Sequence, residues 1–398
     1  MMPDPPGALH LTYGLNIHRG ETWAEHRDAI RGPAAAVKAR VAPGAPFGLG
    51  LRLGDDASRE LMAPGCLAEF RDELAAAGMY AFTINGFPFG RFHGTRVKEE
   101  VYAPDWQTPA RLEYTLRLAQ ILAALLPEGV EGSISTVPGS YRAWISGEDN
   151  VRAMALNLGA AAAALAALRE RTGRTIHLGL EPEPDCFIET TAEFLRFFEE
   201  ELLRGAPGEA AVRRHLGVCV DTCHLAIVGE DAAAALAAAG AAGARVSKIQ
   251  LSAALTALNT PAGRAALSPF AEPVYFHQTR AYDPAGVPAG EWPDLAPALE
   301  ELPGLAGAAE ARVHFHVPLF WAGAGPLGTT RSNLNAEFWR RARAATSHWE
   351  IETYTFDVLP AEMRAGGVVP AICGEYAWVL ENARGGGLAS GFRFQDER

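Results

Sequence analysis

Short apolar runs alternate with longer, helix-length blocks along most of the chain. The run LGVCVD at 216–221 is typical, because five uncharged residues end abruptly in an aspartate. Such runs have the length and β-branched content of buried parallel strands. We predict strands at 11–18, 47–54, 80–87, 131–139, 175–184, 216–223, 245–252, 311–320 and 348–356. We predict helices at 22–40, 57–78, 108–126, 148–171, 190–204, 231–242 and 333–346, with Asp56 and Thr190 among the expected N-caps.

Repeated strand–helix units require parallel strand pairing and right-handed crossovers. Eight or so such units without an obvious central linker favour a closed (β/α)8 TIM barrel over an open doubly wound sheet. No GxGxxG or GxxxxGK[ST] fingerprint follows a strand, which weakens the nucleotide-binding alternative. Nine strands are one too many for this barrel, so we predict one extra strand late in the chain, associated with an insertion at about 253–310. Residues 1–384 are expected to form one domain, followed by a flexible tail at 385–398.

Composition narrows the class of protein. A hydrophobic content of 48% in 398 residues provides for a large core, and a net charge of -12 disfavours a nucleic-acid groove. The five cysteines are scattered and odd in number, which fits a reducing cytoplasm better than a disulfide framework. The N-terminus has no signal-peptide pattern, and the Ala-rich stretch at 154–168 is too short for a convincing membrane span. We therefore expect a soluble cytoplasmic protein without a direct membrane span.

Polar side chains gather where several predicted strands end. The active site of a parallel barrel lies at the carboxyl ends of its strands. The strand ends in question carry Glu181 and Glu183, Asp221 with His224, His314 and His316, and Glu350 and Glu352. Carboxylates and imidazoles converging from separate strands form a ligand set for a divalent cation, which would also compensate the charge of a buried Asp221. Taken singly, each residue has an ordinary explanation: a helix cap, a rim charge or a core histidine. Their common position favours the metal.

The first half of the chain supplies a second polar cluster beside aromatic residues. Aromatic, amide and cationic groups around a barrel mouth suit a polyhydroxylated or phosphorylated small molecule. The alternative is that the loop after the third strand only covers the edge of the barrel. Lys248 is expected one layer deeper than Gln250, on the same face of its strand. The predicted substrate-binding residues are Asn16, His18, Arg52, Asn85, His93 and Gln250.

The strand ends LEPEPD, VDTCH, KIQLS and ETYT resemble the xylose isomerase-like TIM-barrel superfamily, which includes sugar isomerases, epimerases and endonuclease IV-type phosphodiesterases. The resemblance implies Glu181, Asp221 and Glu352 as metal ligands, with His224 matching a further ligand of endonuclease IV-like members. More closely, LNIHRGETW, GLGLRLG, TINGFPFGRFHG, SISTVPGSY, SKIQLSAAL, VHFHVPLF and ETYTFDVLP resemble the EboE "metabolite traffic" family of bacterial ebo gene clusters, over about residues 10–360. That resemblance implies a biosynthetic or export setting with pathway partner proteins.

The chain departs from the sugar enzymes of this superfamily after the seventh strand. Where many of them have a histidine ligand, this chain has Gln250 and Ser252. Gln250, His277 and His316 remain open as the residue that completes the metal site. The segment STVPG lacks the histidine expected in endonuclease IV-like enzymes, and the acidic charge also disfavours DNA repair.

These observations predict an enzyme that uses a divalent cation (Mn, Zn, Mg, Co or Fe) on a small sugar-, polyol- or cyclitol-like metabolite. The expected reaction is an isomerisation or epimerisation by proton transfer beside a carbonyl. The predicted metal ligands are Glu181, Asp221, His224, His316 and Glu352; the predicted catalytic residues are Glu181, Glu352 and Lys248. Three alternatives stay open: a metal-dependent phosphoester hydrolase, an iron-dependent oxidative enzyme, and a non-catalytic metabolite-binding barrel.

Overall fold

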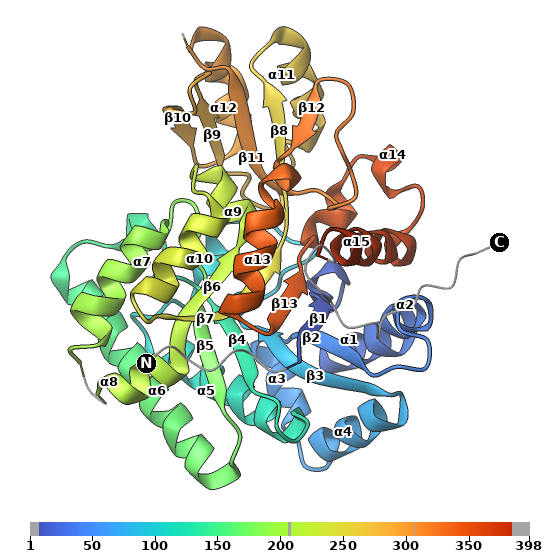
Figure 1. Ribbon diagram of the computed structural model, residues 1–398, viewed down its shortest axis with the longest axis vertical. Coiled ribbons are helices and arrows are strands. Elements are labelled where there is room, and N and C mark those ends of the chain that lie inside the picture. The colour runs from blue at the N-terminus through green and yellow to red at the C-terminus, as the bar shows by residue number, and fades with distance from the viewer. Residues whose placement is uncertain (1–7, 206–207, 306, 384–398) are drawn as a thin grey trace.

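Eight parallel strands pair in the order β1-β13-β7-β6-β5-β4-β3-β2 (Figure 1). A parallel bridge between Gly14 and Gly50 joins the two edge strands, so that the sheet forms a nearly closed barrel. The computed structural model describes residues 8–205, 208–305 and 307–383. The barrel strands are β1 (His10–Tyr13), β2 (Phe47–Arg52), β3 (Met79–Asn85), β4 (Gly132–Thr136), β5 (Ile176–Leu180), β6 (Leu216–Asp221), β7 (Arg245–Leu251) and β13 (His348–Ile351). The predicted (β/α)8 barrel is confirmed.

Helices surround this sheet on its outer side (Figure 1). They are α1 (Trp23–Ala29), α2 (Ala35–Val41), α3 (Asp55–Leu61), α4 (Cys66–Ala76), α5 (Pro109–Leu125), α6 (Glu148–Thr172), α7 (Thr191–Phe197), α8 (Glu209–His215), α9 (Thr222–Ile227), α10 (Ala232–Ala241), α13 (Ala336–Ala345), α14 (Ala361–Arg364) and α15 (Val368–Ala383). Helix α6 is long and apolar enough to cross a membrane by composition, but core helices meet the same criterion. Its Met154, Leu158 and Leu165 are buried in the main hydrophobic core.

The helix predictions hold in outline and fail at particular boundaries. Thr190 caps α7 as predicted, because its hydroxyl accepts a hydrogen bond from the Glu193 backbone amide. In return, the Glu193 carboxylate accepts a hydrogen bond from the Thr190 backbone amide. The predicted helix at 57–78 is two helices, since Gly65 adopts a φ of 87° between α3 and α4. Asp56 is not a cap, because α3 already begins at Asp55. The long final helix α15 was not predicted.

A second, antiparallel sheet is added at one end of the barrel, in the order β10-β9-β11-β8-β12 (Figure 1). Its elements are β8 (Ala254–Leu258), α11 (Pro261–Leu267), β9 (Thr279–Tyr282), β10 (Pro288–Trp292), α12 (Leu295–Glu301), β11 (Glu310–His316) and β12 (Leu327–Thr329). The strand predicted at 311–320 is therefore not a barrel strand: β11 pairs antiparallel with β8 and β9, and β13 closes the barrel. The added sheet runs to Thr329, beyond the predicted end near 310. The predicted tail at 385–398 lies outside the described residues.

Candidate metal centre

Three buried carboxylates converge at the carboxyl ends of the barrel strands. Asp221 is the last residue of β6, Glu181 directly follows β5, and Glu352 directly follows β13. Their oxygens lie within 4.8 Å of one another, and none of the three residues is more than 4% exposed. Each keeps one buried oxygen without a hydrogen-bond partner: Oε2 of Glu181, Oδ2 of Asp221 and Oε2 of Glu352. Buried carboxylate oxygens without donors are costly, so the arrangement calls for a cation between them.

Asp221 is held in place by the helix that follows it. Its Oδ1 accepts hydrogen bonds from the backbone amides of Cys223 and His224, at 2.7 and 3.1 Å, and so caps α9. The Ser252 hydroxyl donates to the same oxygen at 2.6 Å. Oδ2 is left over and is the free oxygen of the site. The helix-cap and metal-ligand interpretations of Asp221 are thus both compatible with its geometry, one for each oxygen.

Two asparagines fix the orientation of Glu352. The side-chain amides of Asn16 and Asn85 donate to Glu352 Oε1 at 2.9 and 3.1 Å. Asn16 follows β1, and Asn85 is the last residue of β3. Because both donors act on Oε1, Oε2 is left without a protein partner.

Three histidines lie beside the carboxylates, and two of them share a candidate metal site with Asp221. His224 belongs to α9, whereas His314 and His316 come from β11 of the added sheet. His224 Nε2 lies 3.1 Å from His314 Nε2, which lies 3.2 Å from His316 Nε2. Each Nδ1 faces an oxygen acceptor: Pro182 O, Gln278 Oε1 and Glu352 O, respectively.

With the protons assigned to Nδ1 by these acceptors, the three Nε2 lone pairs point toward one another. Lone pairs at such distances repel unless a proton or a cation lies between them. The donor set of imidazole nitrogens beside a carboxylate suits Zn, Fe, Co or Mn.

Burial and neighbouring charges shift the pKa values of the ionisable groups in this site. Burial raises the pKa of Glu181 to about 8 and that of Glu352 well above its ordinary value. Burial also tends to raise the pKa of Asp221, but His224, His316 and the Ser252 hydroxyl outweigh it and lower that pKa. Burial lowers the pKa of His316 to about 4 and that of His314 well below its usual range. Adjacent carboxyl groups with opposed shifts are typical of functional sites.

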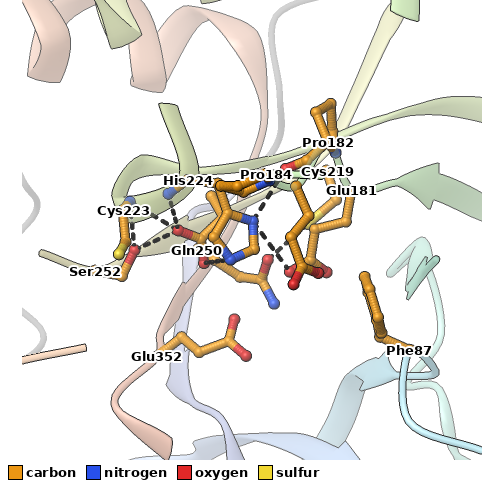
Figure 2. Close-up of polar contacts among 12 residues, drawn as sticks. Phe87, Glu181, Pro182, Pro184, Cys219, Cys223, His224, Gln250, Ser252 and Glu352 are labelled. Carbon is orange, nitrogen blue, oxygen red and sulfur yellow. Dashed lines mark hydrogen bonds and ion pairs between the residues drawn. The ribbon is translucent and has the colours of Figure 1, made fainter. Parts of the chain in front are cut away.

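The predicted metal ligands all lie in this centre, but they form overlapping sets rather than one shell. The sets are Glu181, Asp221 and Glu352; Asp221, His224 and His316; and Cys223, His314 and His316. Figure 2 shows Glu181, Cys223, His224 and Glu352 of these residues. The geometry favours His316 over His277 and Gln250 as the residue that completes the metal site. His277 is occupied by Glu272 and by the His314 carbonyl, and Gln250 Oε1 accepts from Cys219 Sγ. His314 was among the strand-end residues noted in the sequence but was not one of the predicted ligands.

The predicted substrate residues divide into two groups. Asn16 and Asn85 line the cavity above the carboxylates, whereas the others are not among its described lining residues. His18 bonds to the Tyr13 hydroxyl at 2.8 Å, and His93 bonds to the Asn16 carbonyl at 2.8 Å.

Arg52 and Lys248 have structural partners instead. Arg52 donates to Glu21 Oε2 and to the carbonyls of Gly20 and Gly90, each at 2.9 Å, and so holds the loops after β1 and β3. Lys248 forms a fully buried ion pair with Glu350, and this pair raises the pKa of Lys248 despite its burial. The predicted catalytic position of Lys248 is therefore not at the cavity, and the predicted deeper layer fits its burial.

The cavity measures about 520 Å³, counted with its open mouth. Its floor holds the carboxylates, and its wall is aromatic. Phe87, Glu181 and Glu352 all line this cavity and are drawn in Figure 2. The aromatic lining residues are Phe87, Phe92, Tyr102, Tyr275, Phe276 and Tyr354. The sequence indicated an aromatic loop at 85–106, but nothing in it signalled that Tyr275 and Phe276 of the inserted segment would face the same cavity.

Comparisons with known proteins identify the fold. No family model and no curated protein matches the chain. Among solved structures, a xylose isomerase-like TIM barrel protein from Mycobacterium smegmatis in complex with magnesium matches with a TM-score of 0.53 at 10% identity, covering 95% of this chain and 97% of that chain.

Two further structures match with lower scores. The IOLI protein with a binding zinc atom has a TM-score of 0.49 at 11% identity, covering 94% of this chain and 98% of that one. A xylose isomerase domain protein from Alicyclobacillus acidocaldarius has a TM-score of 0.46 at 12% identity, covering 95% and 98%. The chain thus has the fold of the xylose isomerase-like TIM barrels, extended by an antiparallel sheet that contributes to the centre.

Proposed function

We propose that this protein is a divalent-metal-dependent enzyme that moves a proton beside the carbonyl of a small hydroxylated metabolite, as isomerases and epimerases do. The observation that carries the proposal is the set of three buried carboxylates, each with an oxygen that has no protein partner. The M. smegmatis protein of the same fold binds magnesium, which supports a cation in this position.

In the proposed reaction, Glu181 and Glu352 would transfer the proton, and Asn16 and Asn85 would orient Glu352. Glu181 and Glu352 lie on the floor of the cavity, within 4.8 Å of each other and of Asp221. Two carboxylates so placed suit removal of a proton from one face of a carbon and its return to the other. Asn16 and Asn85 hold Glu352 in the required orientation. A bound divalent cation would polarise the substrate carbonyl.

The biological setting is also part of the proposal. The resemblance of the sequence motifs to the EboE family supports a role in the biosynthesis or export of a metabolite, with pathway proteins as partners. We place the activity in the cytoplasm, on the grounds of composition and cysteine content.

The proposal is tested by measuring the metal content of protein purified without chelator, together with deuterium exchange. The wild type should hold at least one cation per chain, and Asp221→Asn should lose most of it. With Mn²⁺ present, the wild type should incorporate deuterium from D₂O beside the carbonyl of probe hydroxyketones, and Glu352→Gln should not.

Glu375→Gln is the matched control, because Glu375 is a fully buried carboxyl group that bonds to Thr353 and Leu319 instead of lining the cavity. It should keep both the cation and the exchange. A wild-type protein that binds no cation refutes the proposal. Bound cation without any exchange favours the non-catalytic metabolite-binding barrel, and phosphate release favours the hydrolase.

A further inference from the structure

We infer that the substrate is amphipathic and not phosphorylated: an oxygen-bearing head reaches the carboxylates, and an apolar or aromatic body fills the cavity above them. This inference rests on the proposed function and narrows its substrate class. It departs from the sugar-, polyol- or cyclitol-like substrate that the sequence predicts.

The fully buried hydrogen-bonding atoms without a partner lie at the floor of the cavity. Among the described lining residues, these atoms are Asn16 Oδ1, Glu181 Oε2 and Glu352 Oε2. The Asn16 and Asn85 amides are already committed to Glu352. Oxygen atoms of a substrate therefore find these partners at the floor, whereas among the tyrosine hydroxyls of the lining only that of Tyr354 makes no hydrogen bond to a described residue.

The upper wall is aromatic and comes from segments far apart in the sequence. Phe92 of the loop after β3, Tyr275 of the added segment and Tyr354 after β13 form a triangle with ring centroids 5.2 to 5.4 Å apart. The Tyr275 hydroxyl donates to the Phe92 carbonyl at 3.0 Å, and the Tyr102 hydroxyl donates to Glu183 at 2.8 Å. Because these two hydroxyls are engaged within the protein, their rings contribute mainly apolar surface.

Polyhydroxylated molecules fit this wall poorly. Each hydroxyl group that loses water without gaining a partner makes binding less favourable. An aromatic or aliphatic body gains from the same surface, both by burial and by ring contacts.

Charge argues against a phosphate group. The one lysine among the described lining residues, Lys98, is paired with Asp294 and lies over the Phe276 ring, 5.4 Å from its centroid. No arginine is among these residues, whereas Glu181, Glu183 and Glu352 are. Phosphate sites are usually built from free arginine or lysine side chains, or from backbone amides at a helix N-terminus.

Hydroxamic acids test the inference, because one metal-chelating head can carry different bodies. The Mn²⁺-loaded protein is titrated by calorimetry with acetohydroxamic, benzohydroxamic and D-threonohydroxamic acid, which carry a methyl, a phenyl and a polyhydroxylated body. We expect benzohydroxamic acid to bind about tenfold more tightly than acetohydroxamic acid, or better, from the additional apolar area buried. D-Threonohydroxamic acid should bind no more tightly than acetohydroxamic acid.

Two phenylalanine variants test whether the aromatic wall causes the preference for the phenyl body. Phe276→Ala should reduce the preference for the phenyl body severalfold while leaving Mn²⁺ affinity unchanged, since Phe276 lines the wall and is not a ligand. Phe320→Ala is the matched control, because Phe320 is 43% exposed and is not among the described lining residues. It should leave the preference as it is in the wild type.

The possible failures can be told apart. Equal affinities for the three acids, or tightest binding of D-threonohydroxamic acid, overturn the inference and leave the proposed metal enzyme standing. Binding of Mn²⁺ without binding of any hydroxamic acid also overturns the inference alone. A wild-type protein that binds no Mn²⁺ overturns the proposed function, and the inference with it.

Discussion

At the scale of single residues, the centre depends on side chains whose two polar atoms have different tasks. Asp221 caps α9 with Oδ1 and leaves Oδ2 free, and Glu352 receives two amides on Oε1 and leaves Oε2 free. The hydrogen bonds made by one atom therefore aim the other. Such supporting contacts hold the carboxylates in position, which lowers the cost of binding a cation at this candidate site.

Asn85→Ala tests this supporting role. The substitution removes one of the two amides that orient Glu352, so we expect Mn²⁺ affinity to fall about tenfold. The dissociation constant is measured by competition with a fluorescent chelator, and a thermal melt checks that the protein still folds. Asn382→Ala is the control, because Asn382 is exposed on α15 and bonds only to the Trp378 carbonyl. Unchanged affinity in Asn85→Ala would show that Glu352 keeps its orientation without this amide.

At the scale of elements, the sequence predicts the barrel strands well because each one repeats the same physical pattern. β6 is buried along its whole length and ends in Asp221, as its apolar run predicts. The sequence also places His314 and His316 at the same strand end, and the structure brings their Nε2 atoms to 3.2 Å from each other. It cannot predict the partner strands of β11, since antiparallel pairing with β8 and β9 depends on contacts distant in sequence.

The partners of buried charged side chains are hidden from the sequence for a related reason. Arg52 and Lys248 are polar residues in apolar strands, which is consistent either with a functional site or with a buried ion pair. Only the positions of Glu21 and Glu350 decide between these, and both prove to be close partners. The aromatic wall is equally hidden, because it forms only when the added segment folds back over the barrel mouth.

The attachment of the added sheet to the barrel gives an element-scale prediction. Arg280 of β9 donates to Asp185 Oδ1 and Glu189 Oε1, at 2.6 and 2.7 Å, in the loop between β5 and α7. Arg280→Gln should weaken this mostly buried contact, so hydrogen exchange in β9 and in residues 182–190 should accelerate about tenfold.

Exchange is carried out on the full-length, metal-loaded protein and is followed in its peptides by mass spectrometry. Arg340→Gln is the control, because Arg340 forms an exposed pair with Glu337 on α13 and should leave exchange in both segments unchanged. If Arg280→Gln also leaves exchange there unchanged, other contacts hold the sheet in place.

At the scale of the whole molecule, the two ends of the barrel have different polar contents. The carboxyl ends of the strands carry the candidate ligands. The opposite end carries His10, His177 and His348, at the beginnings of β1, β5 and β13. They bond to the hydroxyls of Tyr80, Ser247 and Ser133, respectively. These histidines belong to the stability of the barrel, since residues at this end of the fold are usually structural.

Burial lowers the pKa of His10, and it lowers those of His177 and His348 well below 6.5. In the unfolded chain, by contrast, each titrates near its ordinary value of about 6.5. The unfolded state therefore binds more protons below that pH, and the free energy of unfolding falls as the pH drops. The stabilisation is fully present above about pH 6.5, and we expect each deeply buried histidine to cost up to about 2 kcal/mol by pH 5.

His348→Asn tests this acid sensitivity, because asparagine is polar but does not titrate. The variant should be less stable than the wild type at pH 8, since the imidazole packs against Phe82 and His177, but its stability should decline less steeply toward pH 5. Urea unfolding of both proteins is measured at several pH values in chelator, so that metal release does not contribute to the slope. Because the other histidines are common to both proteins, the difference between the slopes reports His348 together with its coupling to the neighbouring His10 and His177. Parallel slopes would mean that His348 accepts a proton in the folded barrel as readily as in the unfolded chain.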